Sequence, residues 1–281
     1  MSIKNNIDKK LKGYSKIVIW GTGGLANTAI NRWLPYDKID YIINGIDYTD
    51  EMYNGFNVYS PESLSGKSPE LILVCSSAYI DIFEQIKKLG IKCEHKYIYE
   101  LFVEEDKNYN ELYSLYIDIL ATKNCNFIKL LLTKPQILVN ISFRLSKFIK
   151  NYKLLYPLYL ILFAIHHLFC LLTSIQLPLN VKAGPGLIFA HPGTIVVTGR
   201  AKLGVFVTIY HCCTIGTTLS GGNPIIDSFV TIYTGSHILG QTYLGKHSKV
   251  GALSLLLDFK GENYSTIAGI PATTKRKYFN N

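Results

Sequence analysis

Aliphatic residues return every six positions through the last third of the chain, and this period constrains the fold more than any other feature. They fall at Leu203, Ile209 and Ile215 and, after a break, at Ile226, Ile232, Ile238, Leu244, Val250 and Leu256. An amphipathic helix would need a period near 3.6, and a half-buried strand a period of 2. A period of six predicts a chain that turns a corner in every hexad, so that three hexads make one triangular coil.

Other positions of the hexad favour the same coil. Glycine follows the aliphatic residue at positions 204, 216, 245 and 251, and the fifth residue is small or aliphatic, as at Cys213, Val230 and Ser236. Stacked coils would align the aliphatic residues in one continuous core. An antiparallel sheet, the alternative, would need this spacing to be accidental. The break at residues 217–225 predicts a loop that projects from the coils.

The residues on this repeat resemble the left-handed β-helix (hexapeptide-repeat) acyltransferases. The likeness lies in L-I-F-A-H-P-G-T-I-V-V over 187–197, C-T-I-G over 213–216, S-G-G-N-P-I-I over 220–226 and A-G-I-P-A over 268–272. It covers roughly residues 176–281 and is closest to the serine O-acetyltransferase and polysaccharide O-acetyltransferase branch. The resemblance implies a left-handed parallel β-helix, acetyl-CoA as co-substrate and a homotrimer with sites between subunits.

Acyl transfer from a thioester to a hydroxyl needs a base, and histidine suits it because its pKa is near 6.5. His191 in F-A-H-P-G matches the position of the family's catalytic histidine. His211, at the third position of hexad 209–214, is the second candidate for the base; the alternative is an ordinary surface residue of the coil.

Two positions depart from the serine acetyltransferase pattern. That family has an Asp 15 positions before the catalytic histidine, where this chain has Gln176, and a His directly before a Pro in the loop, where this chain has Asn223. We expect both changes to favour a sugar hydroxyl over serine as the acceptor.

The resemblance also implies where acetyl-CoA lies. The positions that line the cofactor groove, mainly through backbone groups, correspond to Gly235, Ser236, Gly251 and Ala252. Lys275, just after A-G-I-P-A, could meet the cofactor phosphates or belong to an ordinary basic tail.

The first third of the chain alternates strands and helices. Apolar strands are expected at 16–20, 39–43 and 71–75 and a helix at 77–89, which predicts a small parallel sheet. A turn containing Gly21, Gly23 and Gly24 follows the first strand and could cradle a phosphate at a helix start. Ala26 replaces the usual third glycine and Asn44 the usual acid, so an intact dinucleotide site is not expected.

This segment resembles the degenerate nucleotide-binding-like domains that are fused to sugar-modifying enzymes. Binding of a sugar nucleotide and a purely structural Rossmann-like domain both remain open.

The middle of the chain reads as helical, and residues 154–172 carry no charged side chain. That length could span a bilayer. Pro157, His166 and His167 weaken such a span, and the lysines on its amino-terminal side would leave the β-helix outside the cell, away from acetyl-CoA. We therefore expect helices that pack on the β-helix or its neighbours or dip into the membrane surface.

Composition limits the partners. The net charge of +9 comes almost wholly from lysine, with only four arginines, so the Arg clusters typical of nucleic-acid binding are missing. Phosphates or an anionic membrane would suit this charge; a solvated lysine-rich surface is the alternative.

The six cysteines lack metal-ligand spacing, so no metal is expected. Together with an amino terminus unlike a signal peptide, they predict the cytoplasm.

The sequence thus predicts a Rossmann-like α/β domain (1–105), a helical segment (106–175) and a left-handed parallel β-helix (176–281). The predicted function is acetyl-CoA-dependent O-acetylation of a sugar hydroxyl. The acceptor sugar belongs to a capsule, lipopolysaccharide or other surface glycan or to its precursor, which includes nucleotide-linked sugars. The alternatives are N-acetylation of a nucleotide-linked amino sugar, O-acetylation of serine, and a non-catalytic scaffold or sugar-nucleotide binding module.

Overall fold

The structure, a computed structural model, describes residues 3–45, 51–65, 67, 69–104, 107–122, 127–219 and 221–278. The chain divides into two units, Met1–Glu104 and Glu105–Asn281. The helical segment expected at 106–175 belongs to the same unit as the β-helix.

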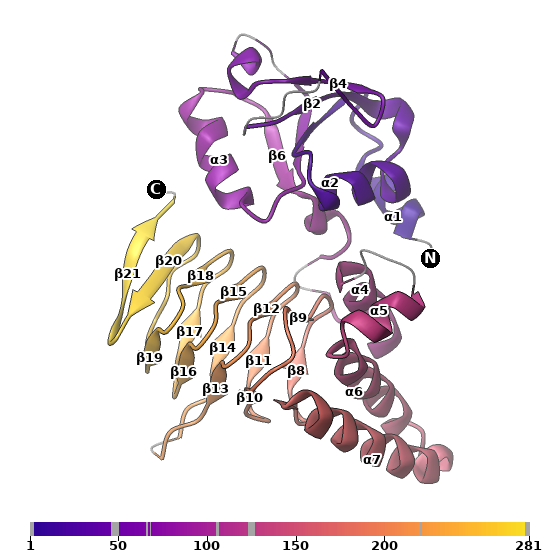
Figure 1. The fold of residues 1–281 in the computed structure, drawn as a ribbon, viewed down its shortest axis with the longest axis vertical. Helices are drawn as coiled ribbons and strands as arrows, with labels where there is room; N and C mark the ends of the chain where they lie inside the picture. Colours follow the sequence, from indigo (N-terminus) through magenta and orange to yellow (C-terminus); the bar gives the residue numbers. More distant parts are fainter. Residues whose placement is uncertain are drawn as a thin grey trace. The chain divides into compact units, whose positions relative to one another are not determined.

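The first unit is built on a parallel sheet with the strand order β4-β2-β1-β5-β6, and β3 pairs antiparallel with β4 at the edge (Figure 1). Its strands are β1 (Ile17–Trp20), β2 (Ile39–Ile43), β3 (Met52–Tyr53), β4 (Phe56–Tyr59), β5 (Leu71–Val74) and β6 (Glu94–Tyr97), and its helices are α1 (Ile3–Lys10), α2 (Gly24–Thr28) and α3 (Tyr79–Lys88). Every residue of β1 and β5 is buried, as in a parallel sheet covered on both faces. The strands expected at 16–20, 39–43 and 71–75 and the helix expected at 77–89 are confirmed as β1, β2, β5 and α3.

The second unit ends in a three-sided parallel β-helix. Its strands are β7 (Ile175–Gln176), β8 (Lys182–Ala183), β9 (Ile188–Phe189), β10 (Ile195–Val197), β11 (Lys202–Leu203), β12 (Thr208–Ile209), β13 (Thr214–Gly216), β14 (Ile225–Ile226), β15 (Thr231–Ile232), β16 (His237–Leu239), β17 (Tyr243–Leu244), β18 (Lys249–Val250), β19 (Leu255–Leu257), β20 (Ser265–Gly269) and β21 (Ala272–Lys277). They form sheets β7-β10-β13-β16-β19, β8-β11-β14-β17 and β9-β12-β15-β18-β20-β21. The hairpin of β20 and β21 closes the far end (Figure 1).

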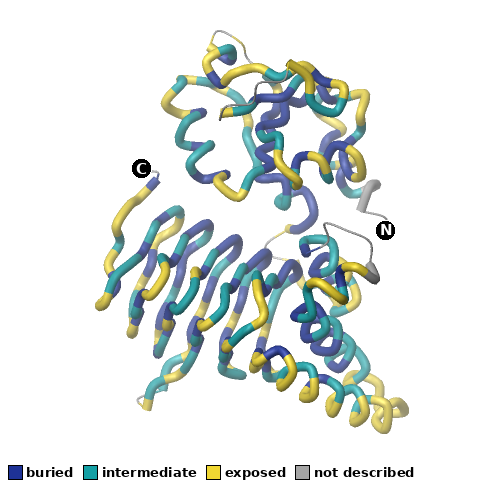
Figure 2. Tube along the Cα trace, in the orientation of Figure 1, coloured by how far each residue is buried: buried dark blue, intermediate teal, exposed yellow. Residues whose placement is uncertain are grey.

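The six-residue period is confirmed by the strand register. Ile226 pairs with Leu244 and Ile232 with Val250, so stacked partners lie eighteen residues apart, which is three hexads. Ile209 and Ile232 also pair, although they lie twenty-three residues apart, because the connection between β13 and β14 is longer than the other corners, where the sequence predicted a loop. The stacked aliphatic side chains are almost completely buried and form one core along the prism (Figure 2).

Small residues at the fifth hexad position fit the corners of the coils. The hydroxyls of Ser236, Ser248, Ser254 and Ser265 each donate to the backbone carbonyl three residues earlier, at 2.6–2.8 Å. Each hydroxyl thus satisfies a turn carbonyl that the parallel ladder leaves unpaired.

At the corners that lead into the sheet of β9 and β12, four aromatic rings stack one above the next. Phe206, Phe229, His247 and Tyr264 all have positive φ, and their successive rings are nearly parallel, with centroids 5.7, 4.7 and 4.7 Å apart. We call these four residues the aromatic corner. Gly186 continues the column below, where a side chain would collide with the Phe206 ring.

In the described part of the second unit, the coils are preceded by the α-helices α4 (Glu111–Thr122), α5 (Phe127–Thr133), α6 (Ile137–Lys150) and α7 (Tyr156–Thr173). α4 and α6 cap the exposed backbone of the first coil through buried polar side chains. Asp118 accepts from the backbone N–H groups of Gly186 and Leu187, and Arg144 donates to the carbonyls of Ala183 and Gly184. Arg144 is also paired with Asp118 at 3.0 Å. This cap supplies partners to a sheet edge that would otherwise be open.

Candidate active site

The candidate residues gather at a second corner of the prism, where the chain passes from the sheet of β9 to the sheet of β10. This corner consists of residues 190–194, 210–213, 233–236 and 251–254 in successive coils, and we call it the site corner. It brings together His191, His211, Gly235, Ser236, Gly251 and Ala252, which the sequence predicted separately.

His191 lies on the surface of the site corner with its side chain exposed. Its ring stands near the rings of Tyr210 and His211, with centroids 6.0 and 5.8 Å apart. Gly193, with φ of +138°, turns the chain just after it, and a Cβ there would lie 3.1 Å from the Cβ of His211. An accessible imidazole on a rigid coil is the geometry that a general base requires.

His211 is held more firmly than His191. Its Nε2 lies 2.8 Å from the hydroxyl of Thr234, and that hydroxyl also lies 3.1 Å from the His211 carbonyl. Its Nδ1 is buried and has no hydrogen-bond partner among the described residues. The hydroxyl of Thr234 therefore fixes the His211 ring beside His191, which suits a residue that positions the site.

Two tyrosines at this corner were missed by the sequence reasoning. The rings of Tyr210 and Tyr233 are tilted by 37° with centroids 5.1 Å apart, and Tyr210 lies beside His191, so the pair forms a wall at this corner. Both follow an aliphatic hexad residue, at the position where the other hexads have Gly, Asp or Leu. An aromatic residue at this position in two successive coils was the signal that could have found them.

The predicted cofactor-lining positions continue the site corner above His211. Gly235 has φ of +71°, and a side chain there would collide with Leu253. Ala252 is exposed, whereas the Ser236 side chain is fully buried, with its hydroxyl oxygen 2.8 Å from the carbonyl oxygens of both Tyr233 and Gly251, either of which can accept its proton. Ser236 could therefore meet a cofactor only through its backbone.

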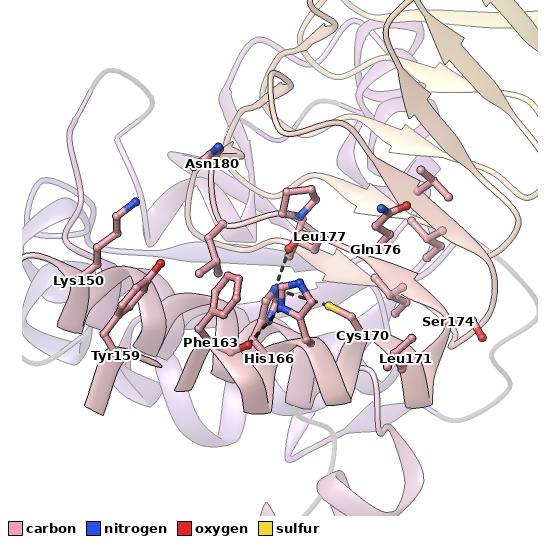
Figure 3. A pocket seen from close by; sticks show the side chains of 16 residues that line it. Lys150, Tyr159, Phe163, His166, Cys170, Leu171, Ser174, Gln176, Leu177 and Asn180 are labelled. Carbon is pink, nitrogen blue, oxygen red and sulfur yellow. Dashed lines mark hydrogen bonds between the residues drawn. The ribbon is translucent and has the colours of Figure 1, made fainter. Parts of the chain in front are cut away.

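Three predicted residues lie elsewhere. Asn223 is exposed in the loop that leaves the coil after β13, at the corner that follows the sheet of β10 rather than the one that precedes it. Gln176 lies in β7 on the wall of a groove beside α7, whose lining does not include His191 (Figure 3). Lys275 is exposed on β21, in the hairpin that ends the β-helix. One copy of the chain thus does not gather these residues around His191.

The predicted nucleotide loop belongs to the first unit. Gly21 has φ of +130°, and a Cβ there would lie 2.9 Å from the Cys75 carbonyl oxygen, so close backbone packing explains this glycine. Gly23 and Gly24, at the start of α2, face open space. Across the described ranges, no cluster of His, Cys, Asp or Glu side chains is arranged to hold a metal ion.

The coils and the site corner define a hexapeptide-repeat β-helix protein, and comparisons with known proteins agree. Serine acetyltransferases are 38% identical over 94 residues in Haemophilus influenzae, 34% over 111 residues in Buchnera aphidicola and 30% over 122 residues in Helicobacter pylori strain J99. These matches cover 32%, 38% and 42% of this chain and 35%, 42% and 71% of those proteins. The chain belongs to the serine acetyltransferase family. It spans only about two fifths or less of the first two relatives.

The solved structures agree on the fold. A hexapeptide-repeat serine O-acetyltransferase from Brucella melitensis matches with a TM-score of 0.50 and 23% identity over 59% of this chain and 67% of that one. A serine acetyltransferase from Neisseria gonorrhoeae also has a TM-score of 0.50, with 20% identity over 61% and 67%. Residues 13–98 match a different family model, described as C2185-like, N-terminal.

Proposed function

We propose that this chain is an acetyl-CoA-dependent O-acetyltransferase and that His191 is its general base. The observation that carries the proposal is an accessible histidine on a rigid coil, in the motif that the family uses, with His211 fixed beside it by Thr234. The family's relatives are named serine acetyltransferases.

His191 takes the proton of the acceptor hydroxyl as the hydroxyl oxygen attacks the thioester carbonyl of acetyl-CoA. It then returns the proton to the thiolate of coenzyme A as the carbon–sulfur bond breaks. Acetyl-CoA supplies the acetyl group as a thioester. Gly235 and Gly251 make room for Leu253 and Ala268 of the next coil, and Ala252 is exposed, so we expect a cofactor lying along the coils to meet mainly backbone groups here. Lys275 remains a predicted phosphate contact. Because acetyl-CoA is made inside the cell, this proposal includes the cytoplasm.

The comparisons favour serine as the acceptor over the sugar hydroxyl that we expected from the sequence. Relatives at 30–38% identity over 94–122 residues carry the serine name. Serine is therefore the first acceptor of this proposal.

A sugar hydroxyl is the second candidate, and two positions favour it. Gln176 and Asn223 replace the Asp and the His that the serine enzymes have there, so the groups that would recognise an amino acid differ. An amide offers both donors and acceptors, which suits a neutral polyol.

The proposal includes a homotrimer. The loop with Asn223 and the corner with His191 lie at different edges of one prism, and a second prism packed alongside could complete the site. Light scattering that finds a fully active monomer would contradict it.

For the first unit we propose a Rossmann-like domain. In the sheet order β4-β2-β1-β5-β6, the chain adds β2 and β4 on one side of β1 and then β5 and β6 on its other side. The strand order therefore reverses beside β1, and the Gly21–Gly24 loop follows β1 at this switch point. Sugar-nucleotide binding there stays a prediction: Gly23→Asp should raise the KM of a nucleotide-linked acceptor, whereas unchanged kinetics would leave the domain structural.

Thiol release from acetyl-CoA, measured with serine, free sugars, amino sugars and nucleotide sugars, tests the activity and the acceptor together. We expect release with serine and O-acetylserine as the product by mass spectrometry. An acetylated sugar instead would favour the second candidate. No transfer to any acceptor would favour a β-helix scaffold.

A further inference from the structure

Helix α7 reverses the pattern of an ordinary surface helix. Its solvent side is mainly apolar, with Leu160, Ile161, Ala164, Leu168, Leu171 and Leu172 exposed beside His167. Only His166 and Thr173 are buried. A surface helix of a soluble protein would show its polar face there, and a patch of this kind marks an interaction site.

Charge at one end of α7 indicates the partner. Residues 154–172 contain no Asp, Glu, Lys or Arg, and their titratable side chains of basic type are His166 and His167, while Lys150 and Lys153 lie exposed just before them. Tyr152, Tyr156 and Tyr159 accompany these lysines. An apolar helix with cations and tyrosines at its polar end matches an anionic membrane surface, where lysines meet phosphates and aromatic rings lie at headgroup level.

The packing of α7 determines how it could meet a membrane. Among the described residues, the stretch Lys153–Thr173 is the one helix long and apolar enough to cross a bilayer. Its inner side is tied to the rest of the unit: the His166 ring nitrogens lie 2.9 Å from the Ser142 hydroxyl and 2.7 Å from the Leu177 carbonyl oxygen. A helix held at its middle by α6 and the first coil can lie in the membrane plane but cannot cross the bilayer without breaking these bonds.

The groove between α7 and the first coil fits the same partner. Its volume is about 610 Å³, and its walls include Phe163, Leu171 and Leu177, with Lys150 and Tyr159 at one end (Figure 3). A groove with mainly apolar walls, which also include Gln176 and Asn180, and with a cation at one end suits an acyl chain whose phosphate lies near the lysine.

We propose that α7 lies in the plane of an anionic phospholipid membrane and docks the protein on it through its exposed apolar side, with Lys150 and Lys153 at the headgroups. This goes beyond the proposed acetyl transfer and does not depend on it.

Vesicle flotation with the full chain tests the proposal. Wild type should float with phosphatidylcholine–phosphatidylglycerol vesicles and bind pure phosphatidylcholine much more weakly. Ile161→Gln should weaken binding about tenfold or more, because an isoleucine leaves the apolar layer. Lys150→Gln should weaken binding to the anionic vesicles about fivefold and leave binding to neutral vesicles unchanged.

Leu257→Gln is the matched control. Leu257 and Ile161 are 56% and 57% exposed, but Leu257 lies on β19, at the opposite edge of the sheet from β7. The control should bind like wild type; an equal loss in both variants would overturn the assignment to α7. Wild type that fails to float with anionic vesicles would overturn the proposal, and a lower molar mass of Ile161→Gln by light scattering would then assign the face to a second copy. Resistance to alkaline carbonate extraction from cell membranes would also contradict docking in the plane, since it marks a spanning helix.

Discussion

The site corner and the aromatic corner have the same backbone turn but different side chains and different roles. At the aromatic corner, the N–H groups of Phe229 and His247 donate to the carbonyls of Val205 and Ser228, one coil below. At the site corner, the N–H groups of Gly235 and Leu253 donate in the same way to His211 and Thr234. All four residues have positive φ. The coils thus repeat one turn, and the side chains alone distinguish the corners.

The difference lies in what covers the turn. The aromatic corner stacks buried rings and leaves its histidine, His247, only 4% exposed. At the matching positions the site corner has Gly235, the exposed Leu253 and the exposed Cys212, and His191 is open to solvent. The corner on which a histidine lies therefore decides whether it is structural or available for chemistry. The following predictions test this difference between the two corners.

The largest expected effect on stability comes from opening the aromatic stack. Phe229→Ala should lower the free energy of unfolding by about 3–5 kcal/mol, because it leaves a cavity between Phe206 and His247. Tyr233→Ala, at the partly exposed wall of the site corner, should cost less than about 1 kcal/mol while lowering turnover. Urea unfolding compares the two; equal losses of stability would contradict the division of roles.

The second largest expected effect is a loss of folding stability at acid pH, caused by protonation at the aromatic corner. Burial, with Lys246 close by, lowers the pKa of His247 from 6.5 to about 4, against a smaller opposing effect of Asp227. The unfolded chain therefore binds the proton first as the pH falls, and stability should decline between pH 6.5 and pH 4, by about 3 kcal/mol in full.

His247→Phe keeps an aromatic ring in the stack and removes the titrating group. Unfolding measured from pH 7 to pH 4 should show a shallower decline in this variant than in wild type. The same slope in both proteins would mean that other groups cause the acid sensitivity.

The smallest effect concerns the hydrogen bond within the site corner. Thr234→Val removes the hydroxyl that fixes His211 and should lower kcat/KM about fivefold, with a stability change of about 1 kcal/mol. Thr234→Ser keeps the hydroxyl and should behave like wild type. Full activity of the Thr234→Val variant would mean that the orientation of His211 does not affect the reaction.

The period of six was enough to predict the coils, the core and the loop, because each step follows from burying one aliphatic residue per hexad. It could not distinguish the corners, since His211 and His247 fit the repeat equally well. The aromatic stack depends on side chains seventeen or more residues apart. Tyr210 and Tyr233 become neighbours only when coils stack. The cap by Asp118 and Arg144 was also beyond sequence reasoning, because two charges in a helical segment usually indicate a solvated face.

The central claim is that His191 is the base, and its alanine variant tests this most directly. His191 is exposed, so His191→Ala should unfold at the same urea concentration as wild type. Its kcat for thiol release from acetyl-CoA should fall by about 10² to 10⁴, with little change in the affinity for acetyl-CoA, while His211→Ala should lose much less. Near wild-type turnover in His191→Ala together with an inactive His211→Ala would contradict the account and transfer the role of base to His211.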